Sequence, residues 1–447
     1  MFNFKREILT FCSLIFCLQM FAQQPVELSL KNAREYALKH NFELRNAQLD
    51  IETARYKVKE TVATGLPQAS ASIGYNDNIG LPVQLVPGDF FGQPGEDIEV
   101  QFGTKYSSSL GASVTQLLFS GSYLVGLQAS RAYLEQSKKN YIKSKTEVNK
   151  TVSDAYFMVL TTQESIVVID STLAITNKLA NQTRVIVENG FAEETELDQL
   201  ELLISELEVG RTNALSQLGI AEAFLKYQLG LDDKSQIVLT ESLASLTEEL
   251  AAEQLFAKQF QVNNNIDFQI LKNQQQLALL QVKLEKSNYL PTLSAFLNYQ
   301  TQAQRQEWDF FNADGKWYAS SVFGINMKIP LFSSGERFAK VKQAQFQYEK
   351  TKVAEEMIST TLNLNYQTNR NDLQNALLTY QNTRNNKAIA EKIFRRTSIK
   401  YTEGMAGSLD LLNTHNQYLS AQSQYINAAL NLLQKSVALE TLLMVGQ

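Results

Sequence analysis

Apolar residues recur every seven positions in two long stretches of the sequence. One stretch runs from Gly121 to Gly190 and the other from Gly335 to Gly404, and both differences, 190 − 121 and 404 − 335, equal 69. In the first stretch the repeat falls on Val152, Val159, Ile166, Leu173, Ala180 and Val187. Neither stretch contains proline, so we expect two very long α-helices. A strict seven-residue repeat favours left-handed coiled-coil rods, each on the order of 100 Å long.

Each predicted rod ends at a glycine and is followed by a second helical stretch. The returning stretches carry their own apolar seams, from Leu197 to Leu225 and from Leu412 to Leu433. Glycine readily adopts the left-handed conformation that ends many helices. The chain therefore predicts two antiparallel helical hairpins, and the periodicity alone fits a fibrous coiled coil as well as a tunnel wall.

Four shorter stretches alternate apolar and polar residues with a period of two. They are residues 68–75, 109–115, 292–300 and 323–329. In the first of them Ala71, Ile73 and Tyr75 alternate with serine and glycine, whereas in the third Phe296 breaks the pattern on the polar side. This alternation predicts β-strands with one oily and one polar face. The proline- and glycine-rich segment 76–103 between the first two strands is expected to be a long loop.

The same order of elements occurs twice along the chain. A helix, two strands and a long hairpin make up 23–230, and the order returns in 264–447. The polar and acidic segment 231–263 is expected to form a connector with short helical pieces. In the first half, the opening helix is predicted over Leu28 to Thr64 as one element.

Residues 1–22 have the composition of a secretory signal peptide. Lys5 and Arg6 precede an apolar run from Ile8 to Phe21, and the small residue Ala22 follows. Both cysteines of the chain lie in this leader, so the mature protein is expected to form no disulfide. No later uninterrupted apolar run of about 18 residues is present, so we expect no membrane-spanning helix and any membrane crossing to use strands.

Charge and motifs disfavour several classes of function. The formal net charge of −5 offers no basic surplus for nucleic acid. The sequence has no phosphate-binding glycine loop, zinc-protease motif or nucleophile elbow, so we expect no enzyme, no cofactor and no metal site. His40 and His415 are isolated from each other, and we expect each to be an ordinary packing or surface residue.

Strands of about ten residues are long enough to cross a membrane. Four strands cannot close a barrel, because open edges in lipid leave unpaired backbone groups. Two chains would give eight strands and three would give twelve. The alternative is a small soluble sheet at one end of a periplasmic or secreted coiled-coil scaffold without a pore.

Several motifs in this order resemble the TolC-type outer-membrane efflux proteins. They are Leu28-Ser29-Leu30, the pairs Leu66-Pro67 and Leu290-Pro291, the run Gln116 to Gly121, Ala155-Tyr156-Phe157, and the glycine turns before Leu-Asp. The resemblance covers the mature chain and implies a mainly α fold. It implies a homotrimer whose helical hairpins form an α-barrel and whose strands share one 12-stranded transmembrane β-barrel.

The resemblance also implies location and partners. The channel would lie in the outer membrane lipid of a Gram-negative cell, with most of the chain in the periplasm. It would be the passive exit duct of an efflux or type I secretion system, joined by a periplasmic adaptor to an inner-membrane transporter that supplies the energy.

Two groups of residues correspond to functional positions of that family. The adaptor-docking tips would contain Gly190, Phe191, Gly404 and Met405, although a simple helix stop also accounts for the glycines. The periplasmic entrance would contain Tyr401, Asp410, Asn413 and Asp198. Asn413 stands where some members of the family have a second aspartate, and Ala406 stands where some have a basic residue. We therefore expect the contacts that close the entrance to be weaker or differently built. The first tip is two residues longer, and its acids also suit an ordinary helix start.

Overall fold

The computed structural model describes residues 26–92, 95–250, 252–312 and 314–444, and the predicted signal peptide 1–22 lies outside this part of the chain. The chain divides into two compact units. The first unit comprises Met1–Ile51, Ser137–Leu271 and Ala354–Gln447, and the second comprises Glu52–Gln136 and Lys272–Val353. Each unit takes segments from both sequence repeats, so the compact units and the repeats divide the chain along different lines.

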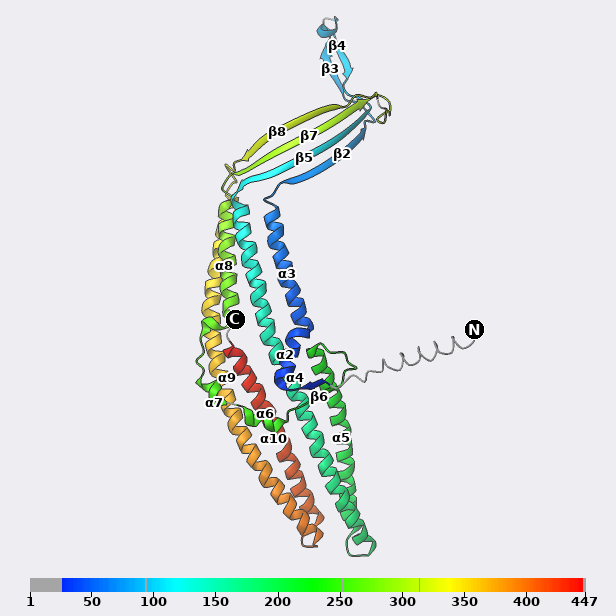
Figure 1. Cartoon of the computed structure of the whole chain (residues 1–447), viewed down its shortest axis with the longest axis vertical. Coiled ribbons are helices and arrows are strands. Elements are labelled where there is room, and N and C mark those ends of the chain that lie inside the picture. The colour runs from blue at the N-terminus through cyan, green and yellow to red at the C-terminus, as the bar shows by residue number, and fades with distance from the viewer. Residues whose placement is uncertain (1–25, 93–94, 251, 313, 445–447) are drawn as a thin grey trace, which may run out of the picture. The chain divides into compact units, whose positions relative to one another are not determined.

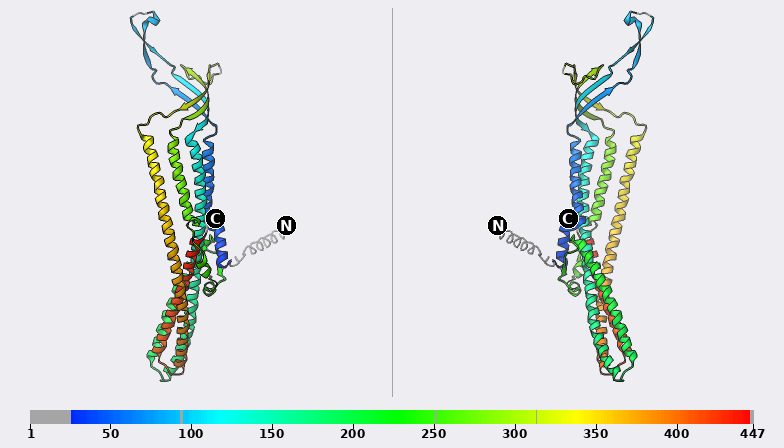
Figure 2. Two further views of the ribbon diagram at one scale, coloured as in Figure 1. Left: turned by 90° about the vertical axis from the view of Figure 1, so that its left-hand side faces the viewer. Right: turned by 90° about the vertical axis from the view of Figure 1, so that its right-hand side faces the viewer.

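Both predicted rods are continuous helices, which the absence of proline allows. They are α4 (Gly121–Glu188) and α9 (Glu336–Thr402), and each is followed by a returning helix, α5 (Glu194–Leu229) and α10 (Ser408–Leu443). The two turns lie at the same end of the first unit in both views of Figure 2. The prediction of two long helical hairpins is confirmed.

The prediction of one helix from Leu28 to Thr64 is wrong in one respect, because the structure has two helices there, with a break at Asn41. A short strand β1 (Val26–Leu28) precedes α2 (Leu30–His40), and α3 (Phe42–Ala63) follows. The Asn41 side chain accepts a hydrogen bond from the backbone N–H of Glu43 at 2.8 Å and donates one to the carbonyl of Gln228 at 2.7 Å. Asparagine at a helix start satisfies backbone donors that would otherwise be unpaired.

The second repeat copies this helix start. Asn265 accepts a hydrogen bond from the backbone N–H of Asp267 at 2.9 Å, at the beginning of α8 (Ile266–Ser287). Both asparagines precede the proline of a Leu-Pro pair by 26 positions, since 67 − 41 and 291 − 265 agree. The sequence duplication is therefore also a duplication of local structure.

The connector contains short elements that pack on the helices of the first unit. They are β6 (Ile237–Leu239), α6 (Leu243–Glu249), α7 (Ala252–Ala257) and the 3-10 turn η2 (Val262–Asn264). β6 pairs with β1 in parallel, with Val26 opposite Ile237. The parallel pair ties the start of the described chain to the connector.

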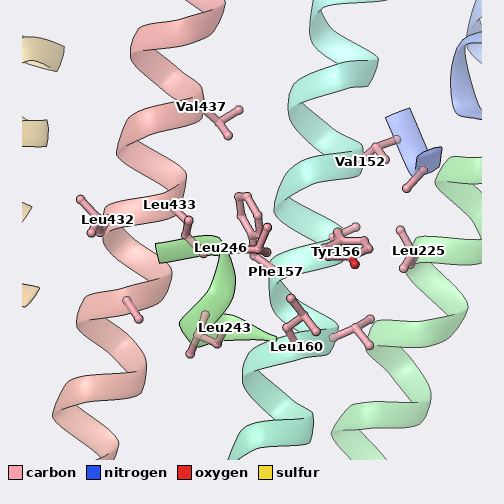
Figure 3. Close-up of a cluster of buried hydrophobic side chains, with 14 of the residues drawn as sticks. Val152, Tyr156, Phe157, Leu160, Leu225, Leu243, Leu246, Leu432, Leu433 and Val437 are labelled. Atoms are coloured by element: carbon pink, nitrogen blue, oxygen red, sulfur yellow. The ribbon is translucent and has the colours of Figure 1, made fainter. Parts of the chain in front are cut away.

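The main hydrophobic core lies where the connector meets α4, α5 and α10 (Figure 3). Figure 3 shows Phe157 of α4 directed toward α6 and α10, whereas the adjacent Tyr156 is directed toward Leu225 of α5. The Tyr156 hydroxyl lies 3.0 Å from both the Leu28 carbonyl and a Glu241 carboxylate oxygen. Consecutive residues on a helix face different neighbours, so this aromatic pair joins the two hairpins and the connector into one core.

The second unit contains a four-stranded antiparallel sheet, shown in Figure 1. Its strands occur in the order β2 (Gln68–Asp77), β5 (Tyr106–Ser120), β7 (Thr292–Arg305) and β8 (Tyr318–Lys328). Three of the four are clearly longer than the alternating stretches indicated. Strands β2 and β8 are its edges and have no second partner within the described residues.

The register places the apolar positions of all strands on one face. Ile73 is opposite Leu110, Val114 is opposite Leu297, and Leu297 is opposite Phe323. Directly opposed residues in an antiparallel pair point to the same side of the sheet. Four separate sequence patterns thus produce one continuous oily surface, and the other side is mainly polar, with serines, glycines and Asn298 beside the apolar Phe296 and Val322.

Phe296 stands on the polar side for a packing reason. It is opposite Gly324 in the register of β7 and β8. A side-chain carbon built on Gly324 would lie 2.5 Å from the Phe296 ring, so the ring covers this glycine. The exception in the alternation is therefore a cross-strand pair in which the Phe296 ring occupies the space that a side chain at position 324 would need.

Segment 76–103 contains more structure than the predicted long loop. Strands β3 (Val83–Pro87) and β4 (Asp97–Gln101) form an antiparallel hairpin, and the 3-10 turn η1 (Gly88–Phe91) follows β3 directly. Figure 2 shows this hairpin extending away from the four-stranded sheet of the same unit. Pro82 stands just before β3 and Pro87 is its last residue, where a missing N–H costs little, so these two prolines did not exclude a strand.

Among the described helices, α4 contains a stretch long and apolar enough for a membrane span by length and composition. This differs from our expectation that no such stretch follows the leader. Small and hydroxyl-bearing residues between the apolar positions interrupt any continuous apolar run, but the mean hydropathy of the stretch stays high. Within the chain, 22% of that stretch is buried. Core helices of soluble proteins pass the same test, so the finding does not place α4 in a membrane.

Candidate functional site

Both hairpins turn at a glycine in the left-handed conformation. Gly190 has φ 76° and Gly404 has φ 70°. The N–H of Phe191 donates to the Ile186 carbonyl at 3.0 Å, and the N–H of Met405 donates to the Lys400 carbonyl at 2.8 Å. With the shorter-range bonds of the glycine N–H groups, these contacts form the same helix-ending motif at both tips.

The residue after each glycine is a large apolar side chain exposed to solvent. Phe191 is 85% exposed and Met405 is 70% exposed. The helix-ending motif fixes the backbone that carries them, so both side chains are held outward at defined positions. Exposed apolar groups on a fixed turn are suited to insertion into a partner.

The predicted entrance residue Tyr401 joins the two hairpins. Its hydroxyl lies 2.7 Å from the hydroxyl of Thr183 on α4 and 3.5 Å from a carboxylate oxygen of Glu196 on α5. Burial, followed by the charge of Glu196, raises the pKa of Tyr401, so the phenol stays neutral and able to donate. The sequence did not identify this contact, because Thr183 lies 218 positions from Tyr401.

A groove of about 800 Å³ lies beside this contact. Its lining comes from the last turns of α4 and α9: Lys178, Asn181, Gln182, Thr183, Val185, Ile186, Tyr401 and Thr402. The groove therefore combines an apolar floor with amide and hydroxyl groups close to both tips. Side-chain mixtures of this kind suit another helix better than a small charged ligand.

The predicted acidic entrance residues lie at the starts of the returning helices. Asp410 is in the first turn of α10, where the helix dipole favours a negative charge. Asp410, Asn413 and Asp198 are all exposed. In the described parts of the chain Asp410 and Asp198 form no ion pair, so a single chain does not bring the predicted ring together.

The described residues contain no group of three or more histidine, cysteine, aspartate or glutamate side chains arranged to hold a metal ion.

The sequence model of the family described as outer membrane efflux protein matches residues 33–230 and 261–444. The gap between the two matches falls on the connector. A curated relative, outer membrane protein TolC of Vibrio cholerae serotype O1, is 24% identical over 243 residues. That alignment covers 54% of this chain and 54% of the relative, so the chain spans about half the length of the curated relative it matches.

Solved structures share the fold over nearly the whole chain. The outer membrane protein VceC of Vibrio cholerae superposes with a TM-score of 0.69 at 15% identity, covering 93% of this chain and 96% of VceC. The MtrE outer membrane channel of Neisseria gonorrhoeae superposes with a TM-score of 0.71 at 17% identity, covering 93% of this chain and 89% of MtrE. The CmeC outer membrane channel of Campylobacter jejuni superposes with a TM-score of 0.70 at 16% identity, covering 93% of this chain and 86% of CmeC. At these identities the likeness establishes the fold.

Proposed function

Because the chain belongs to the outer membrane efflux protein family, we propose that it forms a trimeric outer-membrane channel that serves as the exit duct of an export system. The observation that carries this proposal is the four-stranded sheet, which has one oily face and two edges that no described strand pairs with. Such a sheet is incomplete in a lipid bilayer until its edges are paired.

The exposed side chains of the sheet support a lipid environment. Ile73 is 82% exposed and Phe323 is 71% exposed on the isolated chain. A soluble sheet of this size would bury such an oily face against a second layer. In a closed barrel the same face would contact lipid, and the serine-rich face would line a water-filled lumen.

Two or more copies could close the barrel, and we propose that three do. Pairing β8 of one copy with β2 of the next gives a ring without free edges, and three copies supply twelve strands. Small outer-membrane barrels begin at about eight strands and contain an even number. A twelve-stranded trimer is also the arrangement that the resemblance to TolC-type proteins implies. The helical hairpins of the three copies would then form the periplasmic tunnel.

The domain organisation follows from the duplication. We propose that 23–230 and 264–447 are two structural repeats, linked by the connector 231–263 and preceded by the signal peptide 1–22. Their duplicated asparagine helix starts and glycine tips support this division. Two hairpins per chain would give a tunnel of six quasi-equivalent hairpins.

We further propose that the tips dock onto a periplasmic adaptor, which links the channel to an inner-membrane transporter. The outward Phe191 and Met405, held next to Gly190 and Gly404, and the groove beside Tyr401 support this assignment. Transport through the duct would be passive, with energy supplied by the transporter.

The entrance residues would control the periplasmic opening. Around a threefold axis, copies of Asp410 would come close together and attract cations, with Asn413 on the same helix α10 and Asp198 on the other returning helix, α5. The contact of Tyr401 with Thr183 would hold the second hairpin against the first in the closed state.

Planar-bilayer recording on the detergent-extracted protein tests the proposal. We expect a stable trimer that inserts and conducts ions. Recovery of the protein only from the soluble periplasm, or a folded trimer without conductance, would contradict the channel and favour a coiled-coil scaffold. Crosslinking from single cysteines placed at positions 191 and 405 would capture the adaptor, and the mature chain has no cysteine of its own to compete.

A further inference from the structure

His415 is a buried histidine whose ring has no polar partner. It lies on α10, close to the tip of the second hairpin, and is 1% exposed. Neither ring nitrogen has a hydrogen-bond partner among the described residues. Its ring centroid lies 5.1 Å from that of Phe394 on α9, which itself stacks on Tyr418 at 5.6 Å. An unpaired buried polar group of this kind is costly and demands an explanation.

The first hairpin has an apolar residue at the equivalent position. Both returning helices contain a Leu-Asp pair near their start, ending at Asp198 and Asp410. Five residues further on stand Leu203 in the first hairpin and His415 in the second. Both side chains are buried. Leucine therefore satisfies this position structurally, and the histidine is a departure confined to the hairpin that carries Tyr401.

The surroundings of His415 favour its neutral form. Ionisable residues of the neighbouring segments include Glu391, Lys392, Arg395, Arg396, Lys400 and Tyr401 on α9, Asp410 and Tyr418 on α10, Lys178 and Arg184 on α4, and Glu196, Asp198 and Glu201 on α5. Burial lowers the pKa of His415 from 6.5 to about 4, and no neighbouring charge contributes to the shift. No carboxylate thus stabilises the imidazolium in the closed packing.

We propose that His415 is a proton-sensitive release for the second hairpin: its protonation expels the ring from the contact with Phe394 and loosens the α9–α10 tip. This inference rests on the channel function proposed above. The imidazolium cannot stay in an apolar site without a partner, so it moves to water. Because the Tyr401 contact holds the same hairpin to the first, loosening favours the open entrance.

The direction of the pH effect follows from the two states. The released histidine regains its ordinary pKa near 6.5, whereas the packed histidine binds a proton only near 4. The released state therefore binds more protons between these values, and closed packing is lost as pH falls through this window. For one chain, the ratio of released to packed hairpin rises about 30-fold between pH 7.5 and pH 5.

Bilayer recordings with the tip side held at pH 7.5 or pH 5 test this device. We expect wild-type channels to open more at pH 5, and His415→Leu, which installs the residue of the first hairpin, to lose most of that increase. His415→Gln serves if the leucine variant does not assemble. His40→Gln removes the chain's other, exposed histidine and should respond to pH as wild type does. Leu203→His should give the first hairpin an acid response.

A second measurement does not depend on conduction. Hydrogen exchange of the backbone in 408–420 should accelerate at pH 5, after correction for intrinsic rates, in wild type but not in His415→Leu. Equal pH responses of wild type and His415→Leu in either measurement would overturn the proposal. Absence of conductance from all variants would instead contradict the channel function, and the exchange data would still decide the role of His415.

Discussion

Removing the Tyr401 hydroxyl tests whether a single contact closes the entrance. In Tyr401→Phe the ring stays in place, but the hydroxyl that lies 2.7 Å from Thr183 is lost. Thr183 is 1% exposed, so water cannot easily replace the missing partner. The variant therefore weakens the closed state by removing a hydrogen bond and leaving one group less well satisfied.

The size of the effect follows from these two costs. A neutral hydrogen bond contributes about 0.5–1.5 kcal/mol, and an unsatisfied buried group costs about 1–3 kcal/mol. The Glu196 contact, at 3.5 Å, is too long to add much. We expect about 1–2 kcal/mol per chain. If three copies open together, the closed state loses about 3–6 kcal/mol, which favours opening by about 10²–10⁴-fold.

Single-channel recording of a double-mutant cycle measures this coupling. The cycle compares Tyr401→Phe, Thr183→Val and the double variant, with the open fraction as the observable. Thr176→Val is the matched control, because among the described residues the buried Thr176 hydroxyl bonds within α4, to the Thr172 carbonyl. We expect the two single variants to open the channel and the double variant to add little. Additive effects, or an equal effect of Thr176→Val, would refute the contact as a latch.

Three further predictions concern the ring, the tips and the fold. Asp410→Asn should weaken block of the channel by multivalent cations, and unchanged block in bilayer recordings would place the ring elsewhere. Phe191→Ser and Met405→Ser should each weaken adaptor binding by about 10-fold to 100-fold in a titration with purified adaptor, since each removes one exposed apolar side chain that the proposed complex would bury; full affinity would exclude the tips. Gly230→Ala should lower the melting temperature clearly, because the glycine has φ 73° and a new methyl would lie 2.3 Å from the His40 carbonyl oxygen; wild-type melting would contradict that geometry.

Local patterns predicted most of the elements but missed some of their boundaries. The prediction of the two rods agrees with the structure, because a long stretch without proline and with a constant heptad phase has few alternative structures. The break at Asn41 was missed, although Asn41 caps α3 through the N–H of Glu43; its second hydrogen bond, to the Gln228 carbonyl, joins it to a residue far along the chain. The β3–β4 hairpin was missed because proline and glycine dominate the segment that contains it. Both features had a signal in the sequence. For the break it was an asparagine before an acidic helix start, and for the hairpin it was the alternation around Leu85 and Glu99.

The predicted site residues separate into two kinds. Gly190 and Gly404 were found from sequence because a glycine that ends a helix has a local physical role. Tyr401 was found only through a resemblance, and its partners Thr183 and Glu196 became visible once α4, α5 and α9 were placed together. Asp410, Asn413 and Asp198 keep the standing of predictions, because their proposed contacts lie between copies of the chain.

The sequence by itself determined the periodicities: heptads specified the rods, two-residue alternation specified the strands, and glycines specified the tips. These are properties of neighbouring residues, and helix and strand geometry convert them directly into faces. Only the tertiary structure decided that the oily faces of four strands form one surface, that Tyr401 meets Thr183, and that His415 is buried beside Phe394. Register and packing join residues hundreds of positions apart, and no local pattern contains that pairing.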